Sequence, residues 1–245
     1  RRALAMAIDR SAITRAMLGP LGIEAEPLGN HIFMKNQSGY QDNSGEVGTY
    51  DPARAAQLLD EAGWRLEGDV RRKDGRALEI TTVIPTAVAA SRQESELVQN
   101  MLAQVGIRMQ ISTVPSPDFF ESYVRPGQFD LTHFSWIGTP YPISSTRSLY
   151  ANPTKGPDGQ LIVQQNYARV GSPEIDALYA QANSELDRRA AIGIANKIDA
   201  LIWQEVHSLT LYQRPEMWVV KSNLANVGAV GFADLSYEDI GWAKQ

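Results

Sequence analysis

Apolar residues recur at helical spacing in several stretches of the chain. Near the start, Leu4, Ala5 and Ile8 lie on one stripe, and Asp9 is placed to cap a second short helix that ends at Gly19-Pro20. Cap-plus-proline signals and closing glycines predict further helices. Five are expected. One starts at Asp51-Pro52, a second ends at Gly106, and a third spans Pro117–Val124; the last two start at Ser172-Pro173 and near Asp187.

Shorter runs read as strands. Asp74-Gly75 predicts a turn between two of them, and Ile107, Met109, Ile111 and Thr113 alternate with polar residues, as in a half-buried strand. The order strand, helix, strand, helix, strand predicts an α/β sheet with right-handed crossovers. The expected strands are Trp64–Arg72, Leu78–Ile84, Ile107–Thr113, Phe129–Trp136, Leu209–Tyr212 and Met217–Val220.

Two long segments carry no periodicity. Leu21–Thr49 is rich in Gly, Asn and Gln, and Ile137–Arg169 contains several prolines and glycines, so both are predicted to be loops. Loops of this length inside a domain usually have a function or cover something.

Composition narrows the class of protein. The 245 residues suffice for a sizeable core, and 43% hydrophobic with 21% charged residues is ordinary for a globular chain. The net charge of −5 gives no basic face for nucleic acid, and no apolar run approaches the ~18 residues that span a bilayer. With no cysteine, thiol catalysis, sulfur-ligated zinc and disulfides are excluded. Because Arg1 already lies in a helical pattern, we expect a segment of a longer protein whose signal peptide or lipid anchor would lie outside it.

Several motifs follow one another in the order found in one family. The segment from Arg2 to Arg10 resembles R-x-A-L-x-x-A-I-D-R, and Asp51 to Trp64, followed by Asp74-Gly75, resembles D-P-x-x-A-x-x-L-L-x-x-A-G-W…D-G. Further matches are Leu102 to Ile107 with L-x-x-x-G-I, Phe129 to Leu131 with F-D-L, Ser172 to Asp176 with N-P-E-I-D, and Leu209 to Tyr212 with P-L-Y.

This order resembles extracellular solute-binding protein family 5, the peptide- and nickel-binding proteins of ABC importers, over about 220 residues. The resemblance implies an α/β, periplasmic-binding-protein-like lobe of type II, with a mixed sheet flanked by helices. Residues 1–221 would form the lobe, and residues 222–245 would return toward an N-terminal lobe absent from this sequence. It also implies a non-enzymatic protein without a cofactor. Such a protein would lie outside the cytoplasm, in the periplasm or lipid-anchored at the outer face of the cell membrane, and would deliver its solute to a membrane permease.

One motif departs from the family. Its W-x-x-D-Y-P-D-P pattern provides an aspartate that anchors the free amino group of a peptide, whereas this chain has Thr139 there and Pro142 at the second acid. No carboxylate lies between Asp130 and Asp158. Because a buried ammonium without a counter-charge costs several kcal/mol, the sequence favours a capped or neutral peptide, or a glycoconjugate, over a peptide with a free N-terminus.

The loop Trp136–Arg147 is the main candidate site, because open α/β sheets bind ligands beyond the carboxyl ends of their strands. It combines aromatic area, hydroxyls and one cation, although the same side chains could simply pack the loop and cap a turn. His133 leads into this loop, and Asn166-Tyr167 precedes a predicted helix. The expected ligand-binding residues are Trp136, Thr139, Tyr141, Ser144, Ser145, Arg147, His133, Asn166 and Tyr167.

Other combinations are weaker. His31, His133 and His207 lie far apart without the spacing of metal ligands, so unrelated histidines are favoured over a metal site. Arg169 and Arg214 could meet an anionic group but more often form surface ion pairs. Two further functions stay open: a regulatory or interaction protein of the cell envelope that kept the fold, and a hydrolase, for which no nucleophile elbow or phosphate loop is present.

Overall fold

Aspartates cap the second and third helices, as predicted, in the computed structural model, which describes residues 1–243. Asp9 Oδ1 accepts a hydrogen bond from the Ala12 amide (2.8 Å), and Asp51 Oδ1 accepts one from the Arg54 amide (2.8 Å). The Asp51 amide in turn donates to the Met6 carbonyl (2.8 Å), which ties the third helix to the first. These helices are α1 (Arg2–Met6), α2 (Arg10–Leu18) and α3 (Pro52–Glu61), with a 3₁₀ turn, η1, at Gly19–Leu21.

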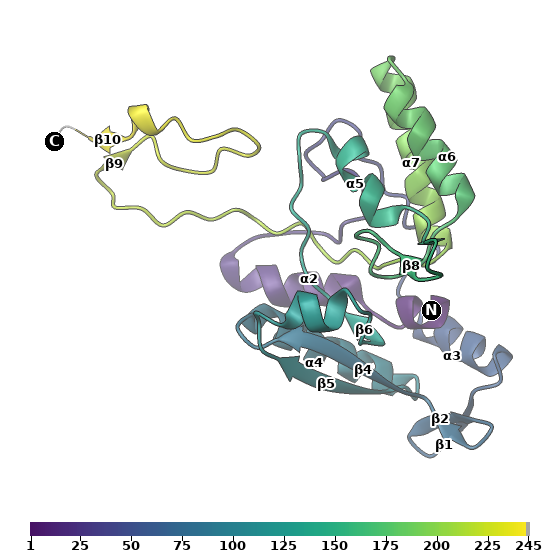
Figure 1. Ribbon diagram of the computed structural model, residues 1–245. Helices are drawn as coiled ribbons and strands as arrows, with labels where there is room; N and C mark the ends of the chain where they lie inside the picture. Colours follow the sequence, from purple (N-terminus) through teal and green to yellow (C-terminus); the bar gives the residue numbers. More distant parts are fainter. Residues whose placement is uncertain (244–245) are drawn as a thin grey trace.

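A small parallel sheet, with strand order β5-β4-β6, lies below α2 in Figure 1. Helix α4 (Ala89–Gln104) connects β4 (Glu79–Pro85) to β5 (Arg108–Val114), and a short π-helical segment, η2 (Phe119–Val124), precedes β6. The predicted strand–helix–strand order is confirmed. The third strand is shorter than predicted, because only Leu131–Thr132 pairs with β4 and the chain then leaves the sheet.

Gly106 makes the reversal from α4 into β5 possible. Its φ is +80°, and a Cβ there would lie 2.7 Å from Leu66 Cδ1 and 2.8 Å from Arg71 Cγ. Only glycine combines this left-handed backbone with so close an approach.

The predicted strand Trp64–Arg72 is wrong as a single element. It is split at Gly68, whose φ of +67° turns the chain back on itself. The result is a separate three-stranded antiparallel sheet, so antiparallel and parallel pairs occur in different sheets. Its strands are β1 (Arg65–Glu67), β2 (Val70–Lys73) and β3 (Arg76–Ala77), with the predicted Asp74-Gly75 turn between β2 and β3.

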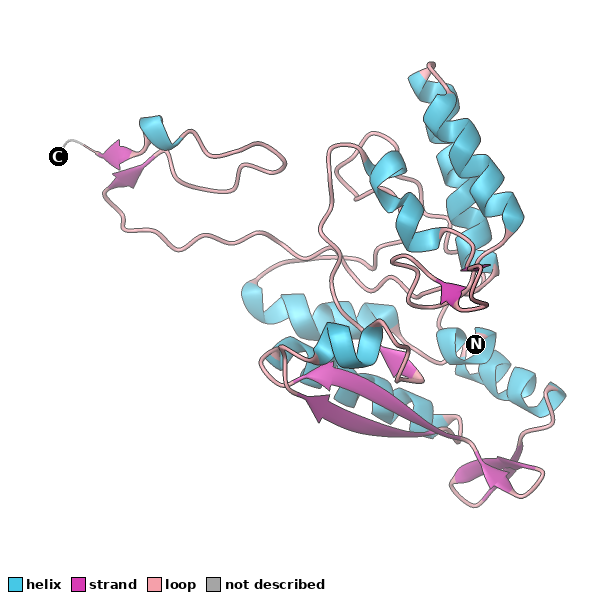
Figure 2. Cartoon of the chain, in the orientation of Figure 1, coloured by secondary structure: helices cyan, strands magenta, loops and turns pink. Residues whose placement is uncertain are grey.

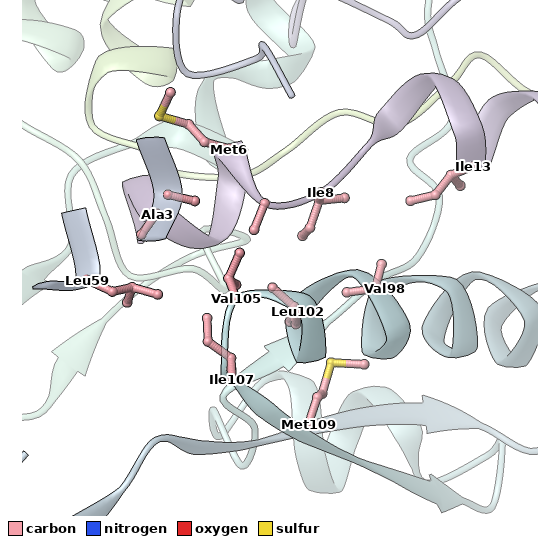
Figure 3. Close-up of a cluster of buried hydrophobic side chains, with 12 residues drawn as sticks. Ala3, Met6, Ile8, Ile13, Leu59, Val98, Leu102, Val105, Ile107 and Met109 are labelled. Carbon is pink, nitrogen blue, oxygen red and sulfur yellow. The ribbon is translucent and has the colours of Figure 1, made fainter. Parts of the chain in front are cut away.

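The first core is built between α1, α2, α4 and β5 (Figure 3). In Figure 3, Val98 and Leu102 of α4 lie between Ile8 above them and Met109 below them, and Leu102 is fully buried. Helix α4 therefore packs on the sheet with its apolar stripe, and α2 packs on α4.

The predicted loop Ile137–Arg169 contains regular structure and is corrected here. Pro142 opens a helix, α5 (Pro142–Tyr150), and two short strands, β7 (Thr154–Lys155) and β8 (Leu161–Ile162), pair antiparallel. Pro142 at the first helical position and the buried pair Leu149 and Tyr150 at its end stabilise a helix that the neighbouring prolines and glycines obscured.

Two long helices form the second part of the fold, α6 (Pro173–Ser184) and α7 (Arg188–Gln204), which pack against each other and against α5 (Figure 2). Both start at the predicted caps: Ser172 Oγ accepts from the Ile175 amide, and Asp187 Oδ1 from the Ala190 amide. Their shared core includes Tyr179 and Ile198, which are fully buried.

A buried polar network fastens the long loop of residues 23–50 to α7. The Asp199 carboxylate accepts from the His31 amide (2.7 Å), from His31 Nδ1 (2.8 Å) and from Asn43 Nδ2 (2.8 Å). Neither the His31 nor the Asp199 side chain is exposed to solvent. This segment is thus a loop, as predicted, with its course fixed by side-chain hydrogen bonds.

After α7 the chain leaves the body through residues 207–214, here called the exit segment. The predicted strands Leu209–Tyr212 and Met217–Val220 are wrong, because both stretches are extended without belonging to a sheet. The chain beyond runs away from the body (Figure 1) and exposes apolar side chains, among them Val219, which is fully exposed. It ends in a small hairpin of β9 (Leu224–Ala225) and β10 (Gly241–Trp242), with a 3₁₀ turn, η3, at Tyr237–Asp239. The last two residues of the predicted tail, 244–245, lie outside the described residues.

Candidate ligand-binding site

An aromatic shelf stands where the chain leaves β6. It consists of Phe120, Phe134, Trp136 and Tyr167. The Trp136 and Tyr167 rings stack with their planes 15° apart and their centroids 6.1 Å apart, while Phe134 meets Trp136 edge-on at 5.4 Å. Trp136 is 47% exposed and Phe120 39%, so the shelf offers aromatic faces to solvent at the carboxyl end of a parallel sheet.

The structure thus brings two of the predicted residues, Trp136 and Tyr167, into direct contact. Phe120 and Phe134 were not predicted as site residues. Phe134 alternates with Trp136 along the chain, and Phe120 follows the buried Phe119, so each looked like a core residue in the sequence.

The hydroxyls of the site loop gather at the start of α5. Thr139 Oγ1 lies 2.8 Å from Ser145 Oγ and accepts from the Tyr141 amide (3.3 Å), while Ser144 Oγ donates to the Tyr141 carbonyl (3.2 Å). The Thr139 carbonyl accepts from Gln37 Nε2 (2.9 Å), which holds this turn against the 23–50 loop. Each hydroxyl keeps free acceptor capacity, and Tyr141 is 76% exposed. The hydroxyls of this turn therefore bond to the start of α5 and also form a polar surface that solvent can reach.

Arg147 lies on the next turns of α5, in an open hollow of about 470 Å³. Among the described residues it forms no ion pair, and the nearest acid in the hollow, Asp176, accepts from the Asn152 amide (3.0 Å). The hollow is lined by Ser144, Arg147, Ser148, Ala151, Asn152, Thr154, Gln164 and Asp176. Its polar lining suits a small polar or anionic group more than an apolar side chain.

Asn166 lies beneath the surface rather than on it. Its side chain is fully buried, and Nδ2 donates to the Ala151 carbonyl (2.8 Å) and the Val170 carbonyl (2.7 Å). His207 Nε2 lies 2.9 Å from Asn166 Oδ1. Asn166 therefore holds the loop that presents Tyr167, and has no surface left for a ligand in this conformation.

His207 packs edge-on under Tyr150, with ring centroids 4.8 Å apart. Burial, with a smaller contribution from nearby His31, lowers the pKa of His207 from 6.5 to about 3. Neutral His207 can then donate from Nε2 to Asn166 and accept at Nδ1 from Ser208 Oγ (3.1 Å).

The low pKa of His207 should make the folded protein less stable in acid. Between pH 6.5 and about 3 the unfolded chain binds a proton at His207 that the folded chain does not, so the free energy of unfolding falls as the pH falls through that window. Because the His207 ring is not wholly enclosed, we expect the free energy of unfolding to fall by about 2 kcal/mol, less than the full pKa shift would give. Denaturant unfolding from pH 7 to pH 4 measures it. His207→Gln should show a shallower acid decline, and an unchanged slope in that variant would contradict the assignment.

His133, the remaining predicted residue, belongs to a charged cluster that sequence reasoning mostly missed. His133 Nε2 lies 3.2 Å from Glu94 Oε2 and 3.0 Å from the Ser91 carbonyl, and the Tyr212 hydroxyl donates to Glu94 Oε1. Arg214 Nη1 approaches Ser135 Oγ (3.4 Å) beside them. One signal was available: Glu94 precedes Val98 and Leu102 by four and eight residues, so an acid occupies the buried stripe of α4.

The cluster changes the acidity of its members. Burial by itself would raise the pKa of Glu94, but the hydrogen bonds from His133 and Tyr212 and the nearby charges of His133 and Arg214 outweigh it, so this pKa lies below its usual value. Burial and the bond to Glu94 raise the pKa of Tyr212. Glu94 is therefore an anion held by partners, and Tyr212 is its neutral donor.

The described residues 1–243 contain no group of three or more His, Cys, Asp or Glu side chains placed to hold a metal ion. Within the same residues, none of the helices has the length and apolar character needed to cross a membrane.

This α/β fold, with aromatic and polar groups gathered where the chain leaves its parallel sheet, has the form of one lobe of a solute-binding protein. The sequence pattern of the family described as bacterial extracellular solute-binding proteins, family 5 (middle region), matches residues 1–158, and the chain belongs to this family. The prediction made from the order of its motifs is confirmed. The family is one of binding proteins rather than enzymes, and its description places it outside the cytoplasm.

Individual relatives agree with this assignment. The chain is 41% identical over all 245 residues to the oligopeptide-binding protein OppA of Mycobacterium tuberculosis H37Rv, and covers 40% of that protein. It thus spans about two fifths of the length of this curated relative. An oligopeptide-binding protein of Thermus thermophilus, solved with a pentapeptide, has the same fold, with a TM-score of 0.83 and 21% identity over 99% of this chain and 43% of its own. NikA of Brucella suis, solved with Fe(III)-EDTA, is 25% identical, with a TM-score of 0.75 over 98% of this chain and 47% of its own. The predicted α/β lobe is confirmed.

Proposed function

We propose that this chain is the ligand-gripping lobe of the substrate-binding component of an ABC importer, and that it captures a peptide or peptide-like solute against a second lobe. The observation that carries the proposal is the exposed aromatic shelf beside the hydroxyl-lined turn of α5, on a chain that aligns along its whole length with an oligopeptide-binding protein. Aromatic faces supply contact area, and the hydroxyls orient polar groups of the ligand.

The second lobe lies in the part of the protein that this sequence does not include. Residues 222–243 support such a lobe, because Trp242 (64% exposed) and Tyr237 (74%) have little of this body to pack on. We assign residues 1–221 to the binding lobe and 222–245 to the return toward the other lobe. Closure of the two lobes would bury the ligand, and the closed form would be presented to a membrane permease. We place the whole protein in the periplasm or lipid-anchored at the outer face of the membrane.

The ligand class follows from the charges around the shelf. Thr139 provides a hydroxyl and no charge, the loop from Trp136 to Arg147 contains no acid, and the nearby Glu94 is already occupied by His133 and Tyr212. Among the described residues around the shelf and the Thr139 turn, no carboxylate is left free for an ammonium, and the one acid of the neighbouring hollow, Asp176, accepts from the Asn152 amide. We therefore infer that the ligand is a capped or neutral peptide, or a glycoconjugate.

This inference predicts an unusual tolerance for N-terminal capping. The full-length protein should bind N-acetylated pentapeptides at least as tightly as the same pentapeptides with free amines, because burying an unpaired ammonium costs several kcal/mol. Isothermal titration calorimetry with matched peptide pools measures the ratio.

Thr139→Asp is the matched variant, since it places an acid in the turn and should shift the preference toward free amines by about tenfold. A wild-type protein that prefers free amines by more than tenfold would contradict the assignment. A protein that binds neither pool, and carries no solute when purified gently and examined by native mass spectrometry, would contradict the proposed function. Recovery of a bound envelope enzyme instead would support a regulatory role.

A further inference from the structure

Three segments that are far apart in the sequence meet at the carboxylate of Glu94. It lies on the first turns of α4, its Oε2 contacts His133 at the end of β6, and its Oε1 accepts from Tyr212 of the exit segment. Arg214 of the exit segment adds a second contact, to Ser135 in the stretch that follows β6. In Figure 1 the chain that rises from β6 crosses the outgoing chain, and the Arg214–Ser135 contact shows that the two segments meet. Glu94 therefore joins the strand that carries the aromatic shelf to the segment by which the chain leaves the lobe.

Other contacts fix the exit segment to the rest of the lobe, among them side-chain bonds of Thr210 and Gln213 to the 23–50 loop and two bonds to the exit segment's backbone. The Leu28 amide donates to the Leu211 carbonyl (3.0 Å), and Arg10 Nη1 donates to the Thr210 carbonyl (3.2 Å). Both reach the exit segment through its backbone and fix it to α2 and the 23–50 loop. Within the described residues, two side-chain contacts relate it to the chain that follows β6: Tyr212 with Glu94, which also contacts His133, and Arg214 with Ser135. A third, between His207 and Asn166, relates it to the loop that presents Tyr167.

Burial alone disfavours an acid at this position. Glu94 is 9% exposed, and its desolvation cost is offset because Tyr212 and His133 bond to it; a leucine would leave these two side chains without their partner. A hydrogen-bonded carboxylate with two directed donors does something that an apolar side chain cannot, since it sets the distance and direction between its partners.

We infer that Glu94 is a positioning residue for ligand capture: it clamps the exit segment to the end of β6 and so sets the angle at which the second lobe closes over the aromatic shelf. This rests on the proposed two-lobed binding function. The low pKa of Glu94, which its hydrogen bonds and neighbouring charges maintain against burial, is consistent with a clamp that stays ionised at neutral pH. Loosening it should widen the range of lobe orientations and weaken capture, because fewer molecules would occupy the closed arrangement.

The test uses the full-length protein with one fluorescent label on each lobe, and the N-acetylated pentapeptide pool as probe. Glu94→Ala should broaden the distance distribution of the ligand-free protein and weaken pool binding by about tenfold, as expected for the loss of a charged hydrogen-bonded partner. Glu94→Gln keeps an acceptor for Tyr212 and should recover most of the affinity. Glu96→Ala removes an exposed acid of the same helix, paired with Arg92 at the surface, and should leave both readouts unchanged.

Tyr212→Phe removes only the hydroxyl and keeps the test open if Glu94→Ala does not fold; it should reproduce the broadened distances. If Glu94→Ala and Tyr212→Phe keep the wild-type distances and affinity and change only the melting temperature, Glu94 is structural and the clamp is refuted. If the wild-type protein binds no peptide of the pool, the proposed function fails, and the distance distributions still decide whether Glu94 controls lobe orientation.

Discussion

Asp199→Ala is expected to destabilise the protein by about 3–5 kcal/mol, because it removes the acceptor of three hydrogen bonds and leaves the His31 ring buried without its acid. The 23–50 loop would keep its hydrogen bonds to Asn196 and Trp203 of α7 but lose those to Asp199, so we expect it to loosen, and with it the Thr139 turn that Gln37 holds. Denaturant unfolding at neutral pH, followed by far-ultraviolet circular dichroism, measures the change.

Two further variants show whether the loss of stability comes from the buried hydrogen-bond network or from the loss of an acid in general. Asp199→Asn keeps the size and one acceptor and should cost less than the alanine change, since part of the network can re-form. Asp69→Ala removes an exposed acid 3.6 Å from Arg108, with 88% of its side chain exposed, and should cost under about 0.5 kcal/mol. If Asp199→Ala were as mild as Asp69→Ala, the buried network would not be what holds the long loop.

Trp136→Ala should weaken binding of the acetylated pentapeptide pool by roughly thirtyfold, about 2 kcal/mol, with little effect on folding. Trp136 offers its exposed face to the ligand and gives Tyr167 a stacking partner, so its removal takes away contact area and frees the neighbouring ring. Calorimetric titration of the full-length protein measures the affinity.

Trp136→Phe should retain part of the binding, because a smaller aromatic face remains. Leu186→Ala is the control: this leucine is 97% exposed between α6 and α7, on a part of the surface that does not include the shelf. Wild-type affinity in Trp136→Ala would show that the ligand does not contact the shelf, and would move the candidate site to the Arg147 hollow.

Features that depend on residues close in sequence were predictable. The caps Asp9, Asp51, Ser172 and Asp187 indicate their helices, because a side-chain acceptor three residues before a free amide is a local arrangement. The strand–helix–strand pattern of β4, α4 and β5 was predictable for the same reason. The loop from Trp136 follows strand β6, as expected from the sequence, whereas Asn166 lies beneath the surface; the ligand-binding roles of the other predicted residues are proposals.

Features that depend on distant partners were not predictable. The stretch Leu209–Tyr212 has the composition of a strand, yet it joins no sheet among the described residues, because a strand requires a neighbouring backbone that the sequence cannot supply. The spacing of Glu94 to Val98 and Leu102 indicates burial, but the donors that make a buried acid stable there, and the partner of Asp199, are evident only once Tyr212 and His31 are in place.

The order of apolar stripes, caps and family motifs in the sequence by itself determined an α/β lobe of a solute-binding protein. Only the tertiary structure decided that Trp136 and Tyr167 form one shelf, and that an acid on α4 joins the shelf to the outgoing chain. The physical reason is that local hydrogen bonds and periodic burial are encoded within a few residues, whereas a buried charge is stable only where distant segments bring their donors to it.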